Sequence, residues 1–192
     1  FAPLALRSPG FFVCRDVASL PVDEQTTCGQ DSVVRFAQRA YRRPLREEER
    51  ARLVSFYADA AAEYGTLDGV VVAVQGILQA PQFLYRPAFG EGDGDVRPLT
   101  SWELASRMSY FLWDSMPDDA LFEAAAAGKL SSDGQIRREA RRMLRDDKAR
   151  AAVVHFHTQW LELDKLHRST PDLAAHAPRY MPHLVEVETP LF

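Results

Sequence analysis

Hydrophobic residues recur along most of this chain at intervals of three and four, the spacing of one face of an α-helix. In residues 31–41, "DSVVRFAQRAY", that face holds Val33, Phe36, Ala37, Ala40 and Tyr41. Pro44 ends this helix, because the residue before a proline is disfavoured in helical geometry. Residues 47–64 repeat the pattern, and the valine-rich residues 67–78 predict a third helix.

The second half opens with a helix start signal. Thr100 and Glu103 have the spacing of a capping box, in which each side chain accepts a hydrogen bond from the other residue's backbone N–H. An apolar stripe follows at Leu104, Ala105, Met108, Phe111 and Leu112. Further helices are predicted over 119–128, over 132–144 (where Ser132 and Gln135 form a second capping box) and over 147–163.

These patterns predict an all-α fold, a helical bundle in two sub-bundles behind an irregular N-terminal segment at 1–29. The Gly- and Asp-rich residues 87–98 mark the boundary. We therefore expect an N-terminal helical domain at 1–88 and a C-terminal one at 97–192. Because the chain begins without Met and both ends read as interrupted, we expect it to be part of a longer protein.

Composition narrows the function classes. The 192 residues include 23 basic and 27 acidic side chains, for a formal charge of −4, whereas dedicated nucleic-acid binders show a basic excess. No apolar run approaches the ~20 residues of a transmembrane helix. We find no haem-attachment CxxCH, phosphate-binding loop or nucleophile elbow, and so no self-contained active site.

Two cysteines, Cys14 and Cys28, flank a polar segment containing one proline. A disulfide closing a loop of ~15 residues stabilises by roughly 3 kcal/mol in an oxidising compartment. Two free thiols are the alternative, and these residues alone leave both open. A metal site is disfavoured, since there is no third cysteine and no histidine near in sequence.

The segment 153–160, "VVHFHTQW", holds His155 and His157 two residues apart. In a helix such residues diverge by about 200°, so the two rings cannot chelate one ion together. We expect His155 near Gln159, His157 near Val153, and Phe156 and Trp160 in the core. Each histidine remains a separate candidate ligand for a metal or haem supplied from elsewhere.

Two arginine clusters stand out, at positions 35–52 and 137–145. The simplest interpretation is a solvated face paired with neighbouring acidic residues. Arg42 and Arg43 differ because they lie at a helix end beside Pro44. There they can cap backbone carbonyls or hold a carboxylate through two hydrogen bonds. Among the carboxylates of "WDSMPDD", Asp118 is expected to cap the next helix rather than bind calcium.

Several stretches, in this order, resemble a known family: "FFVCRD", "TTC", "FAQRAYRRPL", "GILQAPQFLYR", "LTSWELASRMSYFLWDSMPDDAL" and "RRMLRDDKARAAVVHFHTQWLELDKL". They look like the domains of unknown function 1595 and 1592, which occur in tandem in large exported proteins of planctomycetes, myxobacteria and relatives. The resemblance covers nearly the whole chain. It matches Cys14 and Cys28 to the family's cysteine pair and so implies a disulfide.

The resemblance also implies an exported, periplasmic or cell-envelope protein, whose relatives often carry cytochrome c-type domains and, in some cases, carbohydrate-binding-like modules. Our first hypothesis is a helical, non-catalytic region of a haem c-linked oxidoreductase, packing against a cytochrome part outside this chain. His155, His157, Met108 and Met116 are then candidate haem ligands. The second is a scaffold or docking module of a polysaccharide-associated surface protein. Partners would be other domains of the parent chain, a redox partner or a glycan.

Overall fold

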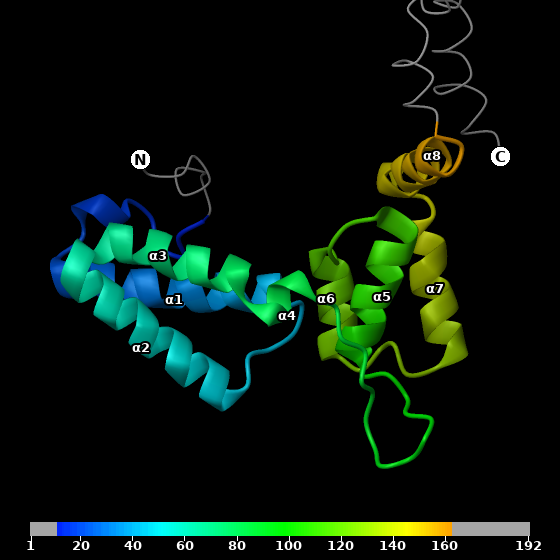
Figure 1. Cartoon of the computed structure of the whole chain (residues 1–192), viewed down its shortest axis with the longest axis horizontal. Helices are drawn as coiled ribbons and strands as arrows, with labels where there is room; N and C mark the ends of the chain where they lie inside the picture. Colours follow the sequence, from blue (N-terminus) through cyan, green and yellow to red (C-terminus); the bar gives the residue numbers. More distant parts are fainter. Residues whose placement is uncertain (1–10, 163–192) are drawn as a thin grey trace, which may run out of the picture. The chain divides into compact units, whose positions relative to one another are not determined.

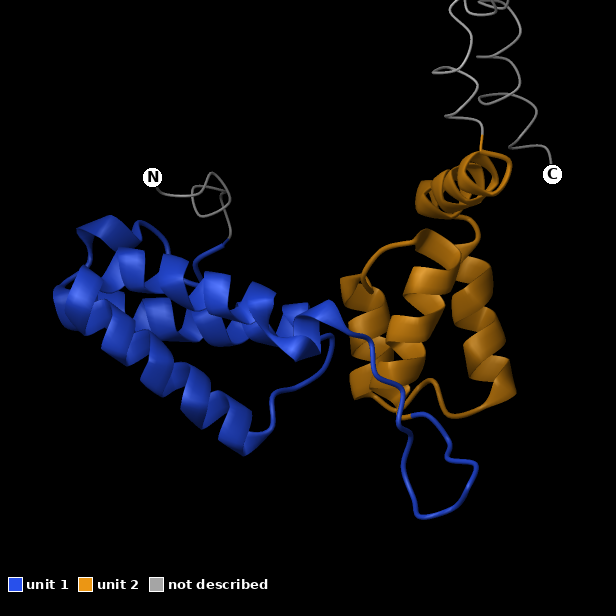
Figure 2. Cartoon of the chain, in the orientation of Figure 1, with its two compact units in different colours: residues 1–99 blue, residues 100–192 orange. Residues whose placement is uncertain are grey.

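The computed structural model describes residues 11–162, which form two compact units divided after Leu99 (Figure 2). Within this range the secondary structure is helical: one 3₁₀ helix and eight α-helices (Figure 1). The all-α prediction is therefore confirmed. No described helix is long and apolar enough to span a bilayer.

The first unit is built on three long helices that pack against one another: α1 (Val22–Ala40), α2 (Glu47–Tyr64) and α3 (Thr66–Gln79) (Figure 1). The 3₁₀ helix η2 (Val17–Ser19) precedes them, and the short helix α4 (Pro81–Leu84) follows α3. The core contains Val33, Ala37, Ala40, Tyr57, Val70, Ala73 and Ile77. The three- and four-residue spacing thus identified the buried face of α1.

Helix α1 begins earlier than the sequence pattern predicted, at Val22 rather than near Asp31. Its first turns are polar, so no apolar periodicity marks them. They are held instead by the disulfide between Cys14 and Cys28 and by Gln25, whose side-chain amide donates to the carbonyl of Leu20 at 2.8 Å. The disulfide is confirmed, but much of the irregular loop expected between the cysteines is helix.

Helices α2 and α3 form a tight hairpin joined by the single residue Gly65, which has a φ of +86°. Four residues later, Gly69 lies against the backbone of α2: a Cβ there would be 2.7 Å from the backbone nitrogen of Ala61. The absence of a side chain at Gly69 therefore permits the close approach of the two helices.

Residues between α4 and the second unit form a loop that closes on itself. The N–H of Glu91 donates to the carbonyl of Pro98 at 2.9 Å. Gly90, with a φ of +67°, starts this closure, and a Cβ there would be 2.7 Å from the same carbonyl oxygen. The closed loop therefore requires glycine at position 90.

The second unit packs three helices against α5 (Ser101–Trp113): α6 (Asp119–Ala126), α7 (Asp133–Met143) and α8 (Asp147–Trp160). Thr100 and Glu103 form the predicted capping box, with hydrogen bonds of 2.9 and 3.1 Å. The Asp118 side chain caps α6 as predicted, accepting from the Leu121 N–H. Gly128, at φ +64°, ends the α6 region where a left-handed residue was expected.

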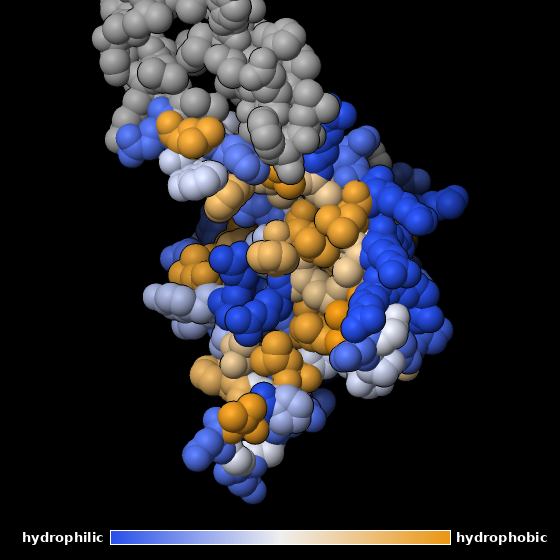
Figure 3. Space-filling model, turned by 90° about the vertical axis from the view of Figure 1, so that its right-hand side faces the viewer, coloured by the Kyte–Doolittle hydropathy of each residue, from blue (hydrophilic) through white to orange (hydrophobic). Residues whose placement is uncertain are grey.

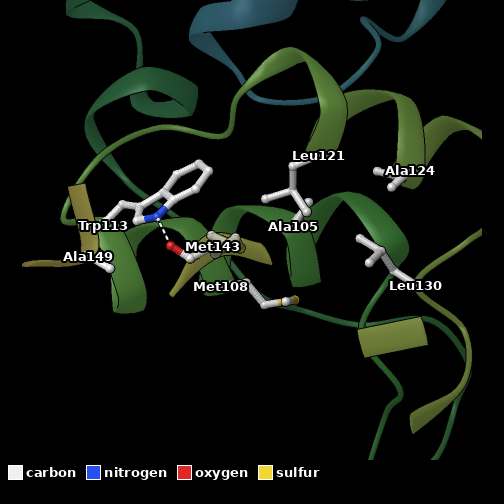
Figure 4. Packing of buried hydrophobic residues seen from close by; sticks show 9 residues of the cluster. Ala105, Met108, Trp113, Leu121, Ala124, Leu130, Met143 and Ala149 are labelled. Carbon is white, nitrogen blue, oxygen red and sulfur yellow. Dashed lines mark hydrogen bonds between the residues drawn. The ribbon is translucent and has the colours of Figure 1, made fainter. Parts of the chain in front are cut away.

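The core of the second unit surrounds Trp113 and Met143 (Figure 4). The Trp113 indole N–H donates to the Met143 carbonyl at 2.8 Å, which satisfies a buried donor and joins the ends of α5 and α7. Met108 lies in the same cluster with Ala105, Leu121, Ala124 and Leu130. Phe111, a member of the predicted apolar stripe, lies outside it and is 84% exposed, and Leu144 after the end of α7 is 59% exposed.

Candidate functional site

Helix α8 carries an exposed aromatic face instead of the buried one that its periodicity predicted. Phe156 is 60% exposed and Trp160 67%, and their rings stack with centroids 5.9 Å apart. Of this helix, only Ala149 is fully buried. The prediction that Phe156 and Trp160 anchor α8 in the core is therefore wrong for the described part of the chain; Leu163, expected on the same face, lies outside that part.

The sequence pattern could not separate a core face from an exposed one here. Both have the same three- and four-residue spacing, and only the neighbouring helices decide which is covered. Exposed apolar side chains of the second unit lie on α5, at the end of α7 and on α8: Phe111, Leu144, Val153, Phe156, Trp160 and Leu161. In the view onto one side of the molecule, hydrophobic side chains form a strip bordered by hydrophilic ones (Figure 3).

His155 lies on the flank of α8 that meets the end of α5. Its Nδ1 is 2.7 Å from a carboxylate oxygen of Asp114, so this nitrogen donates. Its Nε2 then accepts from the side-chain amide of Gln159, also at 2.7 Å. Both ring nitrogens of His155 are engaged by protein groups, and the expected contact with Gln159 is present.

His157 lies on the other flank of α8 and has a different environment. Its Nδ1 is 2.8 Å from the backbone carbonyl of Val153, which can only accept, so Nδ1 carries the proton. The lone pair is consequently on Nε2, the tautomer found in many metal-ligating histidines. The ring packs edge-on against Phe156, with centroids 5.3 Å apart, and lies 6.1 Å from the Trp160 ring.

The two histidines are therefore separate groups, as the helical geometry requires. Within residues 11–162 no three His, Cys, Asp or Glu side chains come together in a group that could hold a metal ion. Of the other candidate ligands, Met108 is buried in the core of the second unit and Met116 is half-buried between α5 and α6. Of the two histidines, only His157 has an unengaged ring nitrogen within the described structure.

Arg42 and Arg43 adopt the two alternative roles that their position predicted, one each. Arg42 is buried, has a φ of +59°, and donates from its guanidinium to backbone carbonyls of Ala40, Gln82 and Tyr85 at 2.8 to 2.9 Å. Arg43 instead binds both carboxylate oxygens of Glu49, at 2.7 and 2.8 Å. The carboxylate that Arg43 holds thus belongs to the chain itself and not to a ligand.

Glu49 borders an open groove between α2 and α3, whose apolar side includes Leu53, Phe56 and Ile77. The hydrogen bonds from Arg43, together with the backbone N–H of Arg46, lower the pKa of Glu49 from 4.5 to about 2. A carboxylate held ionised in this way is a poor general base near neutral pH, because its affinity for a proton is too low. Its role here is to cap the start of α2.

A second charged cluster joins α6 and α7. The Arg142 guanidinium binds both carboxylate oxygens of Asp118, at 2.7 and 3.1 Å, and its Nε donates to Glu139 at 2.9 Å. Burial alone would raise the pKa of Asp118, but the hydrogen bonds from Arg142 and the Leu121 N–H outweigh it and lower that pKa. The same contacts raise the pKa of Arg142. This cluster fixes α7 against the start of α6.

Comparison with protein families gives one match in each unit. Residues 28–87 match the family described as Protein of unknown function (DUF1595), and residues 99–189 match Protein of unknown function (DUF1592). The chain belongs to both families, in tandem. A search of curated proteins and a search of solved structures each found no match.

The two family matches cover different parts of the structure. The DUF1595 match spans most of α1 with α2, α3 and α4, and so contains Cys28, Arg42 and the Arg43–Glu49 pair. The DUF1592 match spans α5 to α8 and both histidines. The exposed aromatic face of α8 is therefore a feature of the DUF1592 part.

Proposed function

We propose that the chain is a non-catalytic helical region of an exported, haem c-linked oxidoreductase, and that α8 packs against a cytochrome part of the parent protein. The single observation that carries this proposal is the exposed, stacked pair Phe156 and Trp160 beside His157. Exposed aromatic side chains that gather on one surface are typical of protein contact sites, where they contribute most of the binding energy.

His157 fits the role of a haem-iron ligand better than His155 or Met108. Its Nε2 lone pair is unengaged within the described structure, and its orientation is fixed by the bond from Nδ1 to the Val153 carbonyl. His155 would have to release Gln159, and Met108 would have to leave the core. A haem c bound elsewhere in the parent chain would supply electron transfer; this chain's part would be to dock it and to offer one nitrogen.

Export is supported by the disulfide between Cys14 and Cys28. Disulfides form and persist in oxidising compartments and are rare in the bacterial cytosol. Cys28 lies in the first turns of α1, which are otherwise polar, and the cross-link to Cys14 substitutes there for missing apolar packing.

The docking proposal is tested by binding between this chain and a separately produced cytochrome part of the parent protein. Phe156→Ser/Trp160→Ser should weaken binding at least tenfold, because the main apolar contact is removed. Phe89→Ser is the matched control, since Phe89 is a 74% exposed aromatic residue in the other unit. Equal affinities for wild type and the double variant would rule out α8 as the contact.

The ligand role is tested separately, by the absorption spectra and the low-temperature electron paramagnetic resonance spectra of haem in the full-length protein. His157→Ala should change the axial-ligand signature, whereas His155→Ala should leave it in place. Unchanged spectra in His157→Ala would exclude His157 as the ligand, while the binding measurement would still decide whether α8 docks.

A further inference from the structure

The outer face of α7 is made almost wholly of arginine. A shallow groove runs along this helix and is lined by Gly134, Arg137, Arg138, Arg141, Arg142 and Arg145. Arg137 and Arg141 lie four residues apart in α7, about 6 Å along the helix axis, and Arg145 follows them in the turn after the helix. The helix has 11 residues and is about 16 Å long, so the row runs from the middle of the helix to the turn beyond its end.

The groove is rigid because the opposite side of α7 is fixed in the core. Met143 is fully buried, and Ile136 and Ala140 pack against the same cluster. Arg142 is anchored by Asp118 and Glu139. The arginine side chains therefore project from a helix whose backbone is already ordered before a ligand binds. This lowers the entropic cost of association.

Much of the row's charge is uncompensated within the described structure. The ion pairs of this face involve Arg138 and Arg142, with Glu139 as a shared partner. Arg137, Arg141 and Arg145 are exposed and have no carboxylate within ion-pair distance among residues 11–162. The chain as a whole is acidic, with a formal charge of −4, so this face is a local reversal of sign.

The residue type indicates the chemistry of the ligand. The face uses arginine and no lysine, and the planar guanidinium matches the paired oxygens of carboxylate, sulfate or phosphate groups. At the groove's first turn, Gly134 leaves open space, so a ligand can approach the backbone there. A row of forks suits an extended ligand that bears oxyanions at intervals, rather than one small anion.

Two of the common polyanions fit this groove poorly. Single-stranded nucleic acids are held by aromatic side chains that stack on the bases, and the groove lining contains none. Helices that lie on anionic membranes insert an apolar face, whereas the apolar side of α7 packs into the core of its own unit.

We propose that the arginine face of α7 is a binding site for an acidic polysaccharide, a linear glycan that bears carboxylate or sulfate groups. The site lies on a different helix from the aromatic face of α8 and does not depend on the cytochrome proposal. Each pair of neighbouring arginines in the row would hold one anionic group of the polymer.

The experiment measures binding of the whole 192-residue chain to dextran sulfate and to neutral dextran, by calorimetry at low and at physiological salt. We expect binding to dextran sulfate alone, weakening as salt rises. Arg137→Glu/Arg141→Glu should lower the affinity at least tenfold. Arg35→Glu/Arg50→Glu is the matched control: it makes the same charge change at two exposed arginines of the first unit and should lower affinity by less than twofold.

Circular dichroism of each variant establishes that it is folded, which is expected because all four positions are exposed. An equal loss in the two double variants would overturn the proposal, because net charge rather than the α7 face would then govern binding. Tighter binding to single-stranded DNA or to phosphatidylglycerol vesicles than to dextran sulfate would also overturn it.

Discussion

The guanidinium of Arg42 donates a 2.9 Å hydrogen bond to the backbone carbonyl of Tyr85, 43 residues further along the chain. The same group reaches the carbonyl of Gln82, so one buried side chain joins the end of α1 to the segment that includes α4. Backbone carbonyls at the C-terminal end of a helix lack hydrogen-bond partners within the helix. A cation there also interacts favourably with the negative end of the helix dipole.

Replacing Arg42 with lysine should destabilise the first unit by about 3 kcal/mol. Lysine keeps the charge and has a comparable backbone cost at φ +59°, but a single ammonium cannot serve carbonyls on both sides of the planar fork. Hydrogen exchange of the α1 and α3 amides measures the change. Arg35→Lys, at an exposed position on α1, is the control and should alter exchange by less than ~0.5 kcal/mol.

The Arg43–Glu49 pair predicts an acid-dependent loss of stability in the first unit. The pKa of Glu49 is lowered to about 2 in the folded chain and returns to about 4.5 on unfolding, so the unfolded state binds more protons between these values. The contribution is fully present above pH ~5 and is lost as pH falls towards 2. Since Arg43 is partly exposed, we expect about 2 kcal/mol.

Glu49→Gln removes this contribution at neutral pH and should flatten the stability profile between pH 5 and 2. Urea unfolding at each pH, together with hydrogen exchange of the α2 amides, measures the free energy of unfolding. Asp118 has the same sign of dependence but lies in the second unit, so the α7 amides serve as an internal reference. A Glu49→Gln profile parallel to that of wild type would contradict the prediction.

Loss of the disulfide should destabilise the first unit by roughly 3 kcal/mol, the loop-entropy value for two cysteines 14 positions apart. Cys14→Ser/Cys28→Ala is the suitable variant, because Cys28 is buried and a hydroxyl there would lack water. Thermal unfolding with and without dithiothreitol gives the comparison. The reductant should lower the melting temperature of wild type and leave that of the variant unchanged.

Two glycines within helices should respond to alanine in opposite directions. At Gly69 a methyl group would press on the backbone of α2, so Gly69→Ala should cost about 1 to 3 kcal/mol. At Gly134 the added Cβ meets nothing within 4 Å, so Gly134→Ala should stabilise by about 0.5 to 1 kcal/mol. Denaturant titration of both variants tests the pair, and two effects of the same sign would contradict it.

The His155–Asp114 contact should couple α5 to α8 only weakly. Both side chains are about half exposed, and exposed pairs contribute about 0.5 kcal/mol. A double-mutant cycle with His155→Ala and Asp114→Asn measures this coupling; asparagine is chosen because it tolerates the left-handed φ of +49°. The fluorescence of the chain's three tryptophans follows unfolding. A coupling above ~2 kcal/mol would mean that the pair is less solvated than the structure indicates.

The features that the sequence predicted are those whose partners lie close along the chain. The capping box of Thr100 and Glu103 needs only a spacing of three, and the buried face of α1 follows from local periodicity. The start of α1 was missed because its first turns are polar and depend on a cross-link to Cys14. That link was inferred from the family resemblance rather than from the residues alone.

The features that the sequence did not predict depend on contacts between residues far apart along the chain. Nothing in residues 42 and 43 tells which arginine meets carbonyls near position 82 and which meets Glu49, since that depends on where α4 packs. Likewise, Phe156 and Trp160 occupy regular helical positions, and only the observed packing of α5 to α8 shows that they are exposed. The roles of His155, His157, Met108 and Met116 towards haem remain predictions.

The closed loop at Gly90 has a practical consequence for engineering the protein. Because the Glu91 N–H meets the Pro98 carbonyl, the chain enters and leaves this loop at nearly the same point. Residues 92–96 can therefore be lengthened without moving either flank, at a cost that grows only slowly with length. The segment is a permissive insertion point, where an epitope, a fluorophore-binding peptide or a whole reporter domain can be added while both helical units stay intact.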